Sequence, residues 1–259
     1  MEIYVCIKRV ADTSEVEIEV DRSGLALEED DFSWDINEWD NFAVEAAVQL
    51  KEKHGGTVTA LTVGGEDDEE VLRRALAMGC DQAIHLCDEA FESADAWCIA
   101  KAITAALVDR QVDLLLFGAV SADQSRGQIG GIVAGLMNLP LVSLATSLEV
   151  NDGKANVRHE VESGLERVLE VDLPAVITVQ TGINEPRYVS IRGIRKVASV
   201  NVPVQTAADV GLSAAELQPR VQLEELFLPK KGDGAQILEG SDDEVIDRLV
   251  SLLQENGGF

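Results

Sequence analysis

A glycine-rich loop at residues 118–131 carries the groups best suited to chemistry in this chain. It reads Gly-Ala-Val-Ser-Ala-Asp-Gln-Ser-Arg-Gly-Gln-Ile-Gly-Gly and lies between an apolar run and a helical pattern. Such a turn presents free backbone N–H groups and the positive end of a helix dipole to an anion. Gly127, Gly130 and Gly131 allow a phosphate to approach closely, and Arg126 adds a charge-assisted contact. The loop matches neither a Walker motif nor G-x-G-x-x-G, so a strand-to-helix turn with nothing bound is the alternative.

Three further segments are expected at the same edge of a sheet. Residues 6–9 and 63–65 close two apolar runs, and residues 37–40 open a helical pattern. In open α/β sheets, ligands bind beyond the carboxyl ends of the strands. Asn37 is expected to cap the helix, which does not exclude a contact to a base or ribose. Trp39 is expected to pack rather than to form a stacking platform.

No acid, base or nucleophile is arranged for catalysis in this sequence. The four cysteines are Cys6, Cys80, Cys87 and Cys98. They form no C-x-x-C pair and have no metal-ligand spacing with the three histidines. Each is predicted to be a small buried apolar residue in a reducing compartment. No Ser-His-Asp or Cys-His motif stands out. The sequence therefore predicts no catalytic residue and no metal site.

Short apolar runs alternate with helical patterns through the first half of the chain. The runs cover residues 3–7, 58–63, 82–86 and 114–117. The helical patterns cover residues 42–50, 71–78, 96–108 and 128–137. This alternation predicts βαβ units with right-handed crossovers. We therefore expect an α/β fold with a doubly wound, mostly parallel, Rossmann-like sheet.

The later part of the chain departs from this alternation. Period-two patterns at residues 148–150 and 157–161 frame Asn151-Asp-Gly153, which predicts a small antiparallel hairpin. Residues 201–259 have little periodicity and are expected to form an extended arm that ends in a helix. Ser241 and Glu244 form the capping box of this helix, and the apolar stripe that follows needs a cover. Either the chain's own core or a second subunit covers this stripe. Residues 1–200 are expected to form the nucleotide-binding α/β domain.

The charge and hydropathy of the chain limit its partners. The formal net charge of −26 argues against nucleic acid and against an anionic membrane surface. The longest nearly apolar stretch, residues 130–145, is interrupted by Asn138 and Pro140 and is too short to span a bilayer. Because the chain begins with a strand pattern, we expect no signal peptide, no membrane insertion and a cytoplasmic location.

The most specific pattern of the sequence lies at residues 164–196. A strand, a Leu-Pro break and a second, apolar strand precede the turn Asn184-Glu-Pro-Arg-Tyr188 and a short basic segment. This order resembles the signature region of the beta subunit of electron transfer flavoproteins. The resemblance covers nearly the whole chain. It includes residues 6–12, 35–40 and 74–79, the loop at 118–131 and the closing helix.

The resemblance implies an adenine-nucleotide-binding fold within a heterodimer whose alpha subunit holds a redox-active FAD. The beta subunit holds either a structural AMP or, in bifurcating members, a second FAD that receives hydride from NADH. The arm and helix then pack on the alpha subunit. Electrons pass from a flavin dehydrogenase, such as an acyl-CoA dehydrogenase, to a quinone oxidoreductase or a similar acceptor. The family's nucleotide contacts fall at Cys6, Asn37, Glu38, Trp39, Asp40, Val63, Gly118, Ala119, Val120, Ser121, Ala122, Asp123, Gln124, Ser125, Arg126, Gly127, Gln128 and Ile129.

Two segments depart from the family pattern. Members often read Asp-Gly-Asp-Thr or Asp-Asp-Asp where this chain has Ser121-Ala-Asp-Gln124. We take this difference to favour AMP over a second FAD. The family's docking loop carries a Leu, and Ile191 is the nearest match here, followed by Arg192 and Arg195. Ile191 is therefore expected to be an exposed anchor for the dehydrogenase, with an ordinary apolar helix contact as the alternative.

Functions of two other classes fit the sequence less well than electron transfer. A nucleotide-binding regulatory protein of the universal-stress type has a similar sheet, but it would lack the turn at residues 184–188 and the long arm. An enzyme that activates a substrate with ATP would need a triphosphate loop, and none is recognisable here. The resemblance favours an electron carrier subunit that is not itself an enzyme.

Overall fold

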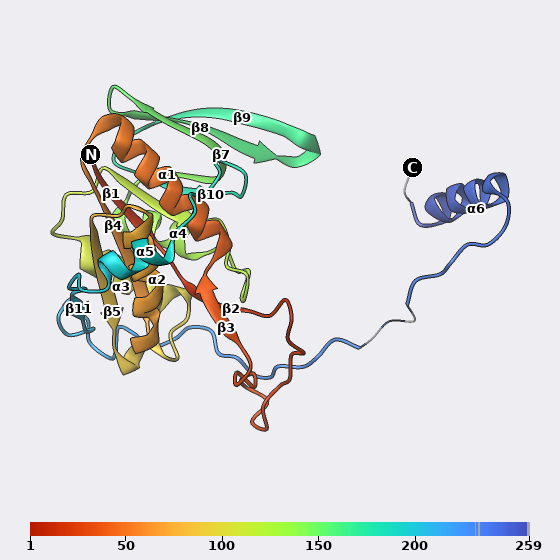
Figure 1. The fold of residues 1–259 in the computed structure, drawn as a ribbon, viewed down its shortest axis with the longest axis horizontal. Coiled ribbons are helices and arrows are strands. Elements are labelled where there is room, and N and C mark those ends of the chain that lie inside the picture. The colour runs from red at the N-terminus through yellow and green to blue at the C-terminus, as the bar shows by residue number, and fades with distance from the viewer. Residues whose placement is uncertain (231, 233, 258–259) are drawn as a thin grey trace. The chain divides into compact units, whose positions relative to one another are not determined.

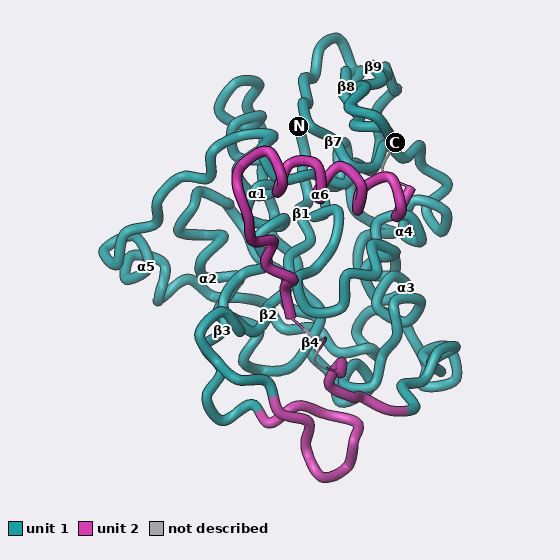
Figure 2. Tube along the Cα trace, turned by 90° about the vertical axis from the view of Figure 1, so that its right-hand side faces the viewer, with its two compact units in different colours: residues 1–18, 29–224 teal, residues 19–28, 225–259 magenta. Residues whose placement is uncertain are grey.

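A computed structural model describes residues 1–230, 232 and 234–257 of the chain. The chain divides into two compact units (Figure 2). One unit comprises residues 1–18 and 29–224, and the other comprises residues 19–28 together with the chain from Glu225 onward. The sheet and the cavity described below belong to the first unit.

Within the described residues, the first unit is built on a nine-stranded sheet (Figure 1). Its spatial order is β11 (Val204–Gln205), β5 (Gln82–Cys87), β4 (Thr57–Gly64), β1 (Glu2–Cys6), β6 (Leu114–Gly118), β10 (Ala175–Val179), β7 (Leu141–Asn151), β8 (Lys154–Val161) and β9 (Leu165–Asp172). Neighbouring strands from β11 to β7 are parallel, and β8 and β9 continue the sheet in antiparallel pairing. The predicted α/β fold with a mostly parallel sheet is confirmed.

Helices cover both faces of the parallel strands, which is why those strands are apolar on both sides. The helices α1 (Glu38–His54) and α2 (Glu69–Met78) pack on one face, and α3 (Ala96–Leu107) and α4 (Ile129–Met137) pack on the other. Side chains alternate along a strand. Val5 therefore joins the core under α1 and α2, whereas Cys6 joins the core under α3 and α4.

The winding of the sheet changes direction between β1 and β6. The strands β4 and β5 follow β1 on one side, whereas β6 and β10 lie on its other side. Such a switch point leaves a crevice beyond the carboxyl ends of the two strands. Cys6 ends β1 opposite Phe117 of β6, and Gly118 ends β6. The crevice is therefore bordered by residues 6–9 and by the glycine-rich loop.

The antiparallel part of the sheet is larger than the predicted hairpin. The first half of β7 pairs with β10 and its second half pairs with β8, after which β9 adds a third strand. The predicted turn at residues 151–153 is present, with Asn151 paired to Lys154 and φ values of 50° and 75° at Asp152 and Gly153. A second sheet, formed by β2 (Arg9–Asp12) and β3 (Ser33–Ile36), was not predicted because its two strands are short and distant in sequence.

The remaining elements are short, apart from the terminal helix. Among the described residues, the 3₁₀ turns are η1 (Glu66–Asp68), η2 (Glu89–Phe91) and η3 (Glu162–Gly164), and α5 spans Ile191–Val197. The sequence pattern places residues 201–224 in the arm, whereas the structure groups them with the first unit, where β11 pairs with β5 and Leu217 is buried.

The second unit contains α6 (Asp242–Glu255). The capping contact predicted for this helix is present, because the Ser241 N–H donates to Glu244 Oε2 at 2.9 Å. Most side chains of its apolar stripe are exposed, including Ile246 at 57% and Leu249 at 48%, whereas Val245 is half-buried.

The four cysteines are free thiols, and three of them are buried as predicted: Cys6, Cys80 and Cys98. The prediction was wrong for Cys87, which is only half-buried because it lies at the end of β5. Burial raises the pKa of Cys80 to about 12.

In the part of the chain that the structure describes, no group of three or more His, Cys, Asp or Glu side chains is arranged to hold a metal ion. The described helices are also too short or too polar to cross a membrane.

Candidate nucleotide-binding site

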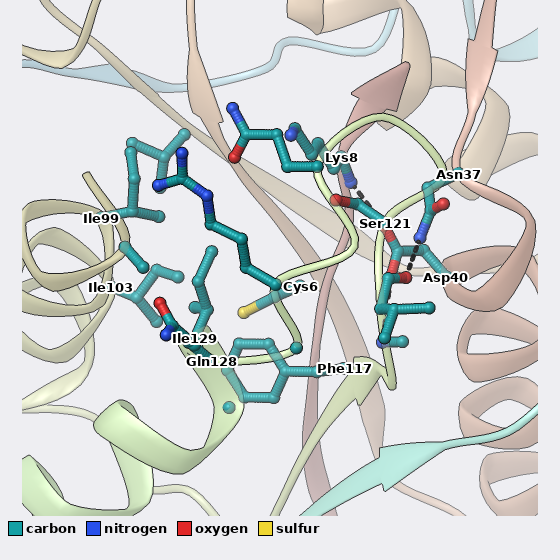
Figure 3. Close-up of a pocket in the computed structure, with 18 of the residues that line it drawn as sticks. Cys6, Lys8, Asn37, Asp40, Ile99, Ile103, Phe117, Ser121, Gln128 and Ile129 are labelled. Carbon is teal, nitrogen blue, oxygen red and sulfur yellow. Dashed lines mark hydrogen bonds between the residues drawn. The ribbon is translucent and has the colours of Figure 1, made fainter. Parts of the chain in front are cut away.

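A cavity of about 270 Å³ opens at the carboxyl ends of β1 and β6. Figure 3 shows Lys8, Asn37 and Asp40 on one side of Cys6, and Ile99 and Ile103 of α3 on the other. The cavity therefore has a polar side, formed by strand ends and loops, and an apolar side, formed by a helix. This division suits a ligand with a charged end and a flat apolar end.

Asp40 ties the two strand ends to the first helix. It lies in the first turn of α1, where the helix dipole favours a carboxylate, and it is only 6% exposed. Its Oδ2 accepts the Lys8 N–H at 2.8 Å, and its Oδ1 accepts the Gly118 N–H at 3.0 Å. Burial raises the pKa of this carboxyl to about 7, although these hydrogen bonds oppose the rise. Asp40 therefore shapes the cavity by holding both of its edges.

Gly118 is required at the end of β6 for steric reasons. A Cβ at this position would lie 2.3 Å from Asp40 Oδ1 and 2.7 Å from the Trp39 Cβ. It would also lie 2.9 Å from the Asp40 backbone nitrogen, so the clash cannot be relieved without moving α1. The glycine thus lets the loop leave the sheet directly over the start of α1.

Asn37 holds the loop rather than the helix. It occupies the N-cap position of α1, as predicted, but its side chain makes no capping hydrogen bond to the helix. Its Nδ2 donates instead to the Val120 carbonyl at 2.9 Å (Figure 3), and its Oδ1 accepts the Ala122 N–H at 3.0 Å. One buried amide therefore fixes two residues of the loop that follows β6.

The two cationic side chains of the cavity, Lys8 and Arg126, differ in their ion-pair partners. Lys8 forms an ion pair with Asp123, so its charge is largely compensated. Burial alone would raise the pKa of Asp123, but the hydrogen bonds from Lys8 and Ser121 lower it below the ordinary value. Arg126 also lines the cavity, and among the described residues no carboxylate forms an ion pair with it. Arg126 is therefore the cation best placed to meet an anionic ligand.

The amino-terminal end of α4 faces the same space. Gln128, Ile129 and Gly130 line the cavity, and the first N–H groups of a helix have no partners within it. Gly130 has no room for a side chain, because its Cβ would lie 2.7 Å from Thr178 Cγ2. The expectation for Gly131 was wrong, since it is exposed, does not line the cavity and would place a Cβ no nearer than 3.8 Å to Leu141. Gly130 thus lets the first turn of α4 pack closely on β10 and β6, whereas Gly127 lies in the cavity lining with a φ of 57°.

The apolar side of the cavity was missed in the sequence. It is formed by Phe91, Ile99 and Ile103, together with Leu61 and Phe117 from the sheet. On a helix, side chains at i and i+4 lie on one face, so Ile99 and Ile103 both reach the cavity from α3. The sequence signal that could have located this side is Asp95, the residue that caps the start of α3. It accepts the Cys98 N–H at 2.9 Å and also lines the cavity.

The structure brings most of the predicted nucleotide contacts together. Those lining the cavity are Cys6, Asn37, Asp40, Val63, Gly118, Ala119, Val120, Ser121, Gln124, Arg126, Gly127, Gln128 and Ile129. Those outside its lining are Glu38, Trp39, Ala122, Asp123 and Ser125. Trp39 donates from Nε1 to Gln180 Oε1 at 2.7 Å, which places it in the packing between α1 and β10. Asp123 acts on the cavity through Lys8.

The predicted docking residues lie apart from the cavity, on α5. Ile191 is 69% exposed, and Arg192 and Arg195 are exposed beside it. Ile194 and Tyr188 add apolar surface, at 42% and 90% exposure. We refer to Tyr188, Ile191, Arg192, Ile194, Arg195 and Lys196 as the docking surface.

Comparisons with known proteins agree with this architecture. The family model of the electron transfer flavoprotein domain matches residues 24–210. The beta subunit of the electron transfer flavoprotein of Bacillus subtilis is 38% identical over 256 residues, which cover 98% of each chain. The corresponding subunit of Methylophilus methylotrophus is 33% identical over the full length of both chains.

A third relative comes from a larger assembly. The subunit CarD of the caffeyl-CoA reductase–Etf complex of Acetobacterium woodii is 35% identical over 261 residues, which cover 98% of each chain. These matches span essentially the whole of the present chain and of its relatives. The chain therefore belongs to the electron transfer flavoprotein family, as a protein of its beta-subunit type.

Proposed function

We propose that this chain holds AMP in the cavity at the end of β1 and β6, as one half of a heterodimeric electron carrier. The alpha subunit of that heterodimer holds the redox-active FAD. Electrons reach the FAD from a flavin dehydrogenase of the acyl-CoA dehydrogenase type and leave to a quinone oxidoreductase or a similar acceptor. The beta chain itself supplies no catalytic group. The cytoplasmic location stays a prediction.

The size and polarity of the cavity carry the proposal of AMP. Its volume of about 270 Å³ is at the lower limit of ligand pockets, which measure roughly 300–1,000 Å³. A mononucleotide suits this space better than a dinucleotide does. The adenine would lie against Ile99 and Ile103, and the phosphate would meet Arg126 and the first turn of α4.

The docking surface supports the proposed dehydrogenase partner. It combines the exposed side chains of Ile191 and Ile194 with three basic residues, on a chain whose net charge is −26. A basic cluster on so acidic a protein favours a partner with an acidic rim around an apolar pocket. The arm and α6 are proposed to pack on the alpha subunit, because the exposed apolar side chains of α6 need a cover.

A bifurcating subunit with a second FAD, which oxidises NADH, is the second candidate. The relative from Acetobacterium woodii is a subunit of a caffeyl-CoA reductase–Etf complex, which favours a reductase as the partner in this second candidate. The loss of the family's acidic residues around Asp123 and the small cavity favour AMP instead.

The nucleotides released on denaturation test the proposal. The chain is co-expressed with the alpha subunit of the same organism, and the purified yellow heterodimer is denatured and analysed by chromatography. We expect one AMP and one FAD for each heterodimer. Two FAD without AMP would replace the proposal by the bifurcating candidate. A colourless homodimer that ignores the alpha subunit would favour a universal-stress-type regulatory protein.

A further inference from the structure

The helix that carries the docking surface has no core of its own. None of the seven residues of α5 is buried, and isolated helices shorter than about 12–15 residues are marginal in water. Val189 and Val197 at its two ends rest partly on the core. Gly193 faces α2, where a Cβ would lie 4.0 Å from Ala77. Groups outside α5 must therefore hold it in place.

Arg73 of α2 holds the carboxyl end of α5. Its Nη1 donates to the carbonyl oxygens of Val197 and Ala198 at 3.0 Å each, and to that of Val200 at 3.3 Å. The last carbonyls of a helix lack helical partners and carry the negative end of its dipole. Glu69, one turn earlier on α2, forms an ion pair with Arg73. The guanidinium is thus fixed on α2 and satisfies the end of α5.

Arg187 holds the turn that leads into α5. Its Nε donates to Glu45 Oε2 at 2.7 Å, and its Nη1 donates to Glu52 Oε1 at 2.8 Å. Both glutamates belong to α1, and Glu45 is only 3% exposed. A guanidinium that bonds two carboxylates in this way has a fixed orientation. Ser190 then accepts the Gly193 N–H at 3.1 Å and begins the helix.

We propose that Arg73 and Arg187 are positioning residues that keep α5 preformed for a protein partner with an apolar pocket and an acidic rim. The inference rests on the docking role proposed above. A preformed element loses less conformational entropy on binding than an element that the partner must order. Removal of either arginine therefore weakens docking, although neither arginine belongs to the docking surface.

Amide hydrogen exchange on the intact heterodimer tests the preformed state without any partner. In Arg73→Gln, exchange of the amides in residues 194–200 is expected to be about tenfold faster, because the charge-assisted contacts of Nη1 to three carbonyl oxygens are lost. Arg74→Gln is the matched control. Arg74 is the next residue on α2, and its Nη1 lies 2.7 Å from Asp35 Oδ2, away from α5. Equal exchange in the two variants would overturn the proposal.

Electron transfer from an acyl-CoA dehydrogenase that reduces the wild-type heterodimer gives the second measurement. In Arg73→Gln the KM for the dehydrogenase is expected to rise about tenfold, with kcat, AMP content and FAD content unchanged. Arg73→Lys should restore part of the loss, because it returns the charge. Faster exchange with an unchanged KM would show that docking does not need a preformed helix, and the proposal would be wrong.

Arg187→Lys keeps the positive charge but breaks the fork between Glu45 and Glu52. It is expected to loosen the amides of residues 190–194 and to raise the KM several-fold. This variant keeps the test decisive if Arg73→Gln does not fold. A failure of the docking role itself has a different signature, because Ile191→Ala would then leave the KM at the wild-type value. In that case the exchange measurement still decides whether the two arginines hold α5.

Discussion

The cavity and α5 are held in opposite ways. At the cavity, buried polar side chains hold the chain from within the protein. At α5, apolar side chains are exposed to solvent, and two arginines near the surface hold the helix. Asp40 and Asn37 fix strand ends and a loop from within. Arg73 and Arg187 fix a short helix from its ends. Buried polar groups leave little freedom for replacement, because each must find a partner. Surface hydrogen bonds and ion pairs are weaker and more tolerant.

This difference matches what each region has to do. A site for a resident nucleotide benefits from a shape that does not change, since the ligand stays bound during many turnovers. A docking surface must bind and release its partner, so its hold on the protein needs only to exceed the cost of ordering a short helix. We therefore expect changes at the cavity to affect folding and nucleotide content, and changes at α5 to affect only docking.

The largest expected effect comes from Gly118. Gly118→Val places atoms where a Cβ alone would lie 2.3 Å from Asp40 Oδ1. The free energy of unfolding is expected to fall by about 3 kcal/mol, and AMP should be lost from the purified heterodimer. Gly135→Ala is the control, because a Cβ there meets nothing within 4 Å. If denaturant unfolding gives the two variants equal stability, the cavity is not held as rigidly as the contacts of Gly118 indicate.

The second effect is a pH dependence at Asp40. Because its pKa is raised from 3.8 to about 7 in the folded chain, the folded state holds a proton that the unfolded state loses between these values. Stability from this group is full below pH 3.8 and is lost as the pH rises toward 7. Wild-type stability should therefore fall by on the order of 2 kcal/mol between pH 5 and 8 relative to Asp40→Asn.

Asp123 gives the opposite sign and serves as the control for this measurement. Its pKa is lowered in the folded chain, so its contribution is present at neutral pH and is lost as the pH falls through the acidic range. Asp123→Asn should therefore change the stability at pH 7 and leave the slope between pH 5 and 8 intact. A wild-type profile that is flat across this window would contradict the environment inferred for Asp40.

A smaller effect is expected from Arg126. Arg126→Gln should weaken AMP binding about tenfold, because one charge-assisted contact to the phosphate is removed. Isothermal titration of nucleotide-free heterodimer with AMP measures this change. Arg110→Gln is the matched control. Arg110 donates to the Ala106 carbonyl at 2.9 Å and follows the carboxyl end of α3, whereas the amino-terminal end of α3 lines the cavity. Unchanged affinity in Arg126→Gln would move the phosphate away from this arginine.

The smallest effect sharpens the comparison at the docking surface. Ile191→Ala should raise the KM for the dehydrogenase several-fold and leave the stability and the flavin content unchanged, because Ile191 is 69% exposed. Val108→Ala removes an equally exposed side chain, at 70%, from the end of α3. If both variants slow electron transfer to the same extent, Ile191 has no special role in docking.

Much of this molecule could be predicted from local patterns. The runs at residues 3–7, 58–63 and 114–117 predicted parallel strands because strands covered on both faces must be apolar throughout. Asp152 and Gly153 predicted a turn because few other residues accept positive φ. The glycine-rich loop predicted the edge of the sheet where the cavity lies, since a strand that ends in glycine and continues into a helix leaves its N–H groups free.

Other features depended on residues that are distant in sequence. Asp40 joins Lys8 and Gly118, and Ile99 faces the loop that follows β6. Arg73 meets carbonyl groups more than 120 positions later, with separations of 124, 125 and 127. A sequence specifies which side chains want burial, charge or a turn, because these are properties of single residues and their near neighbours. Which of them share a partner is decided only when the sheet brings them together, since hydrogen bonds act over about 3 Å.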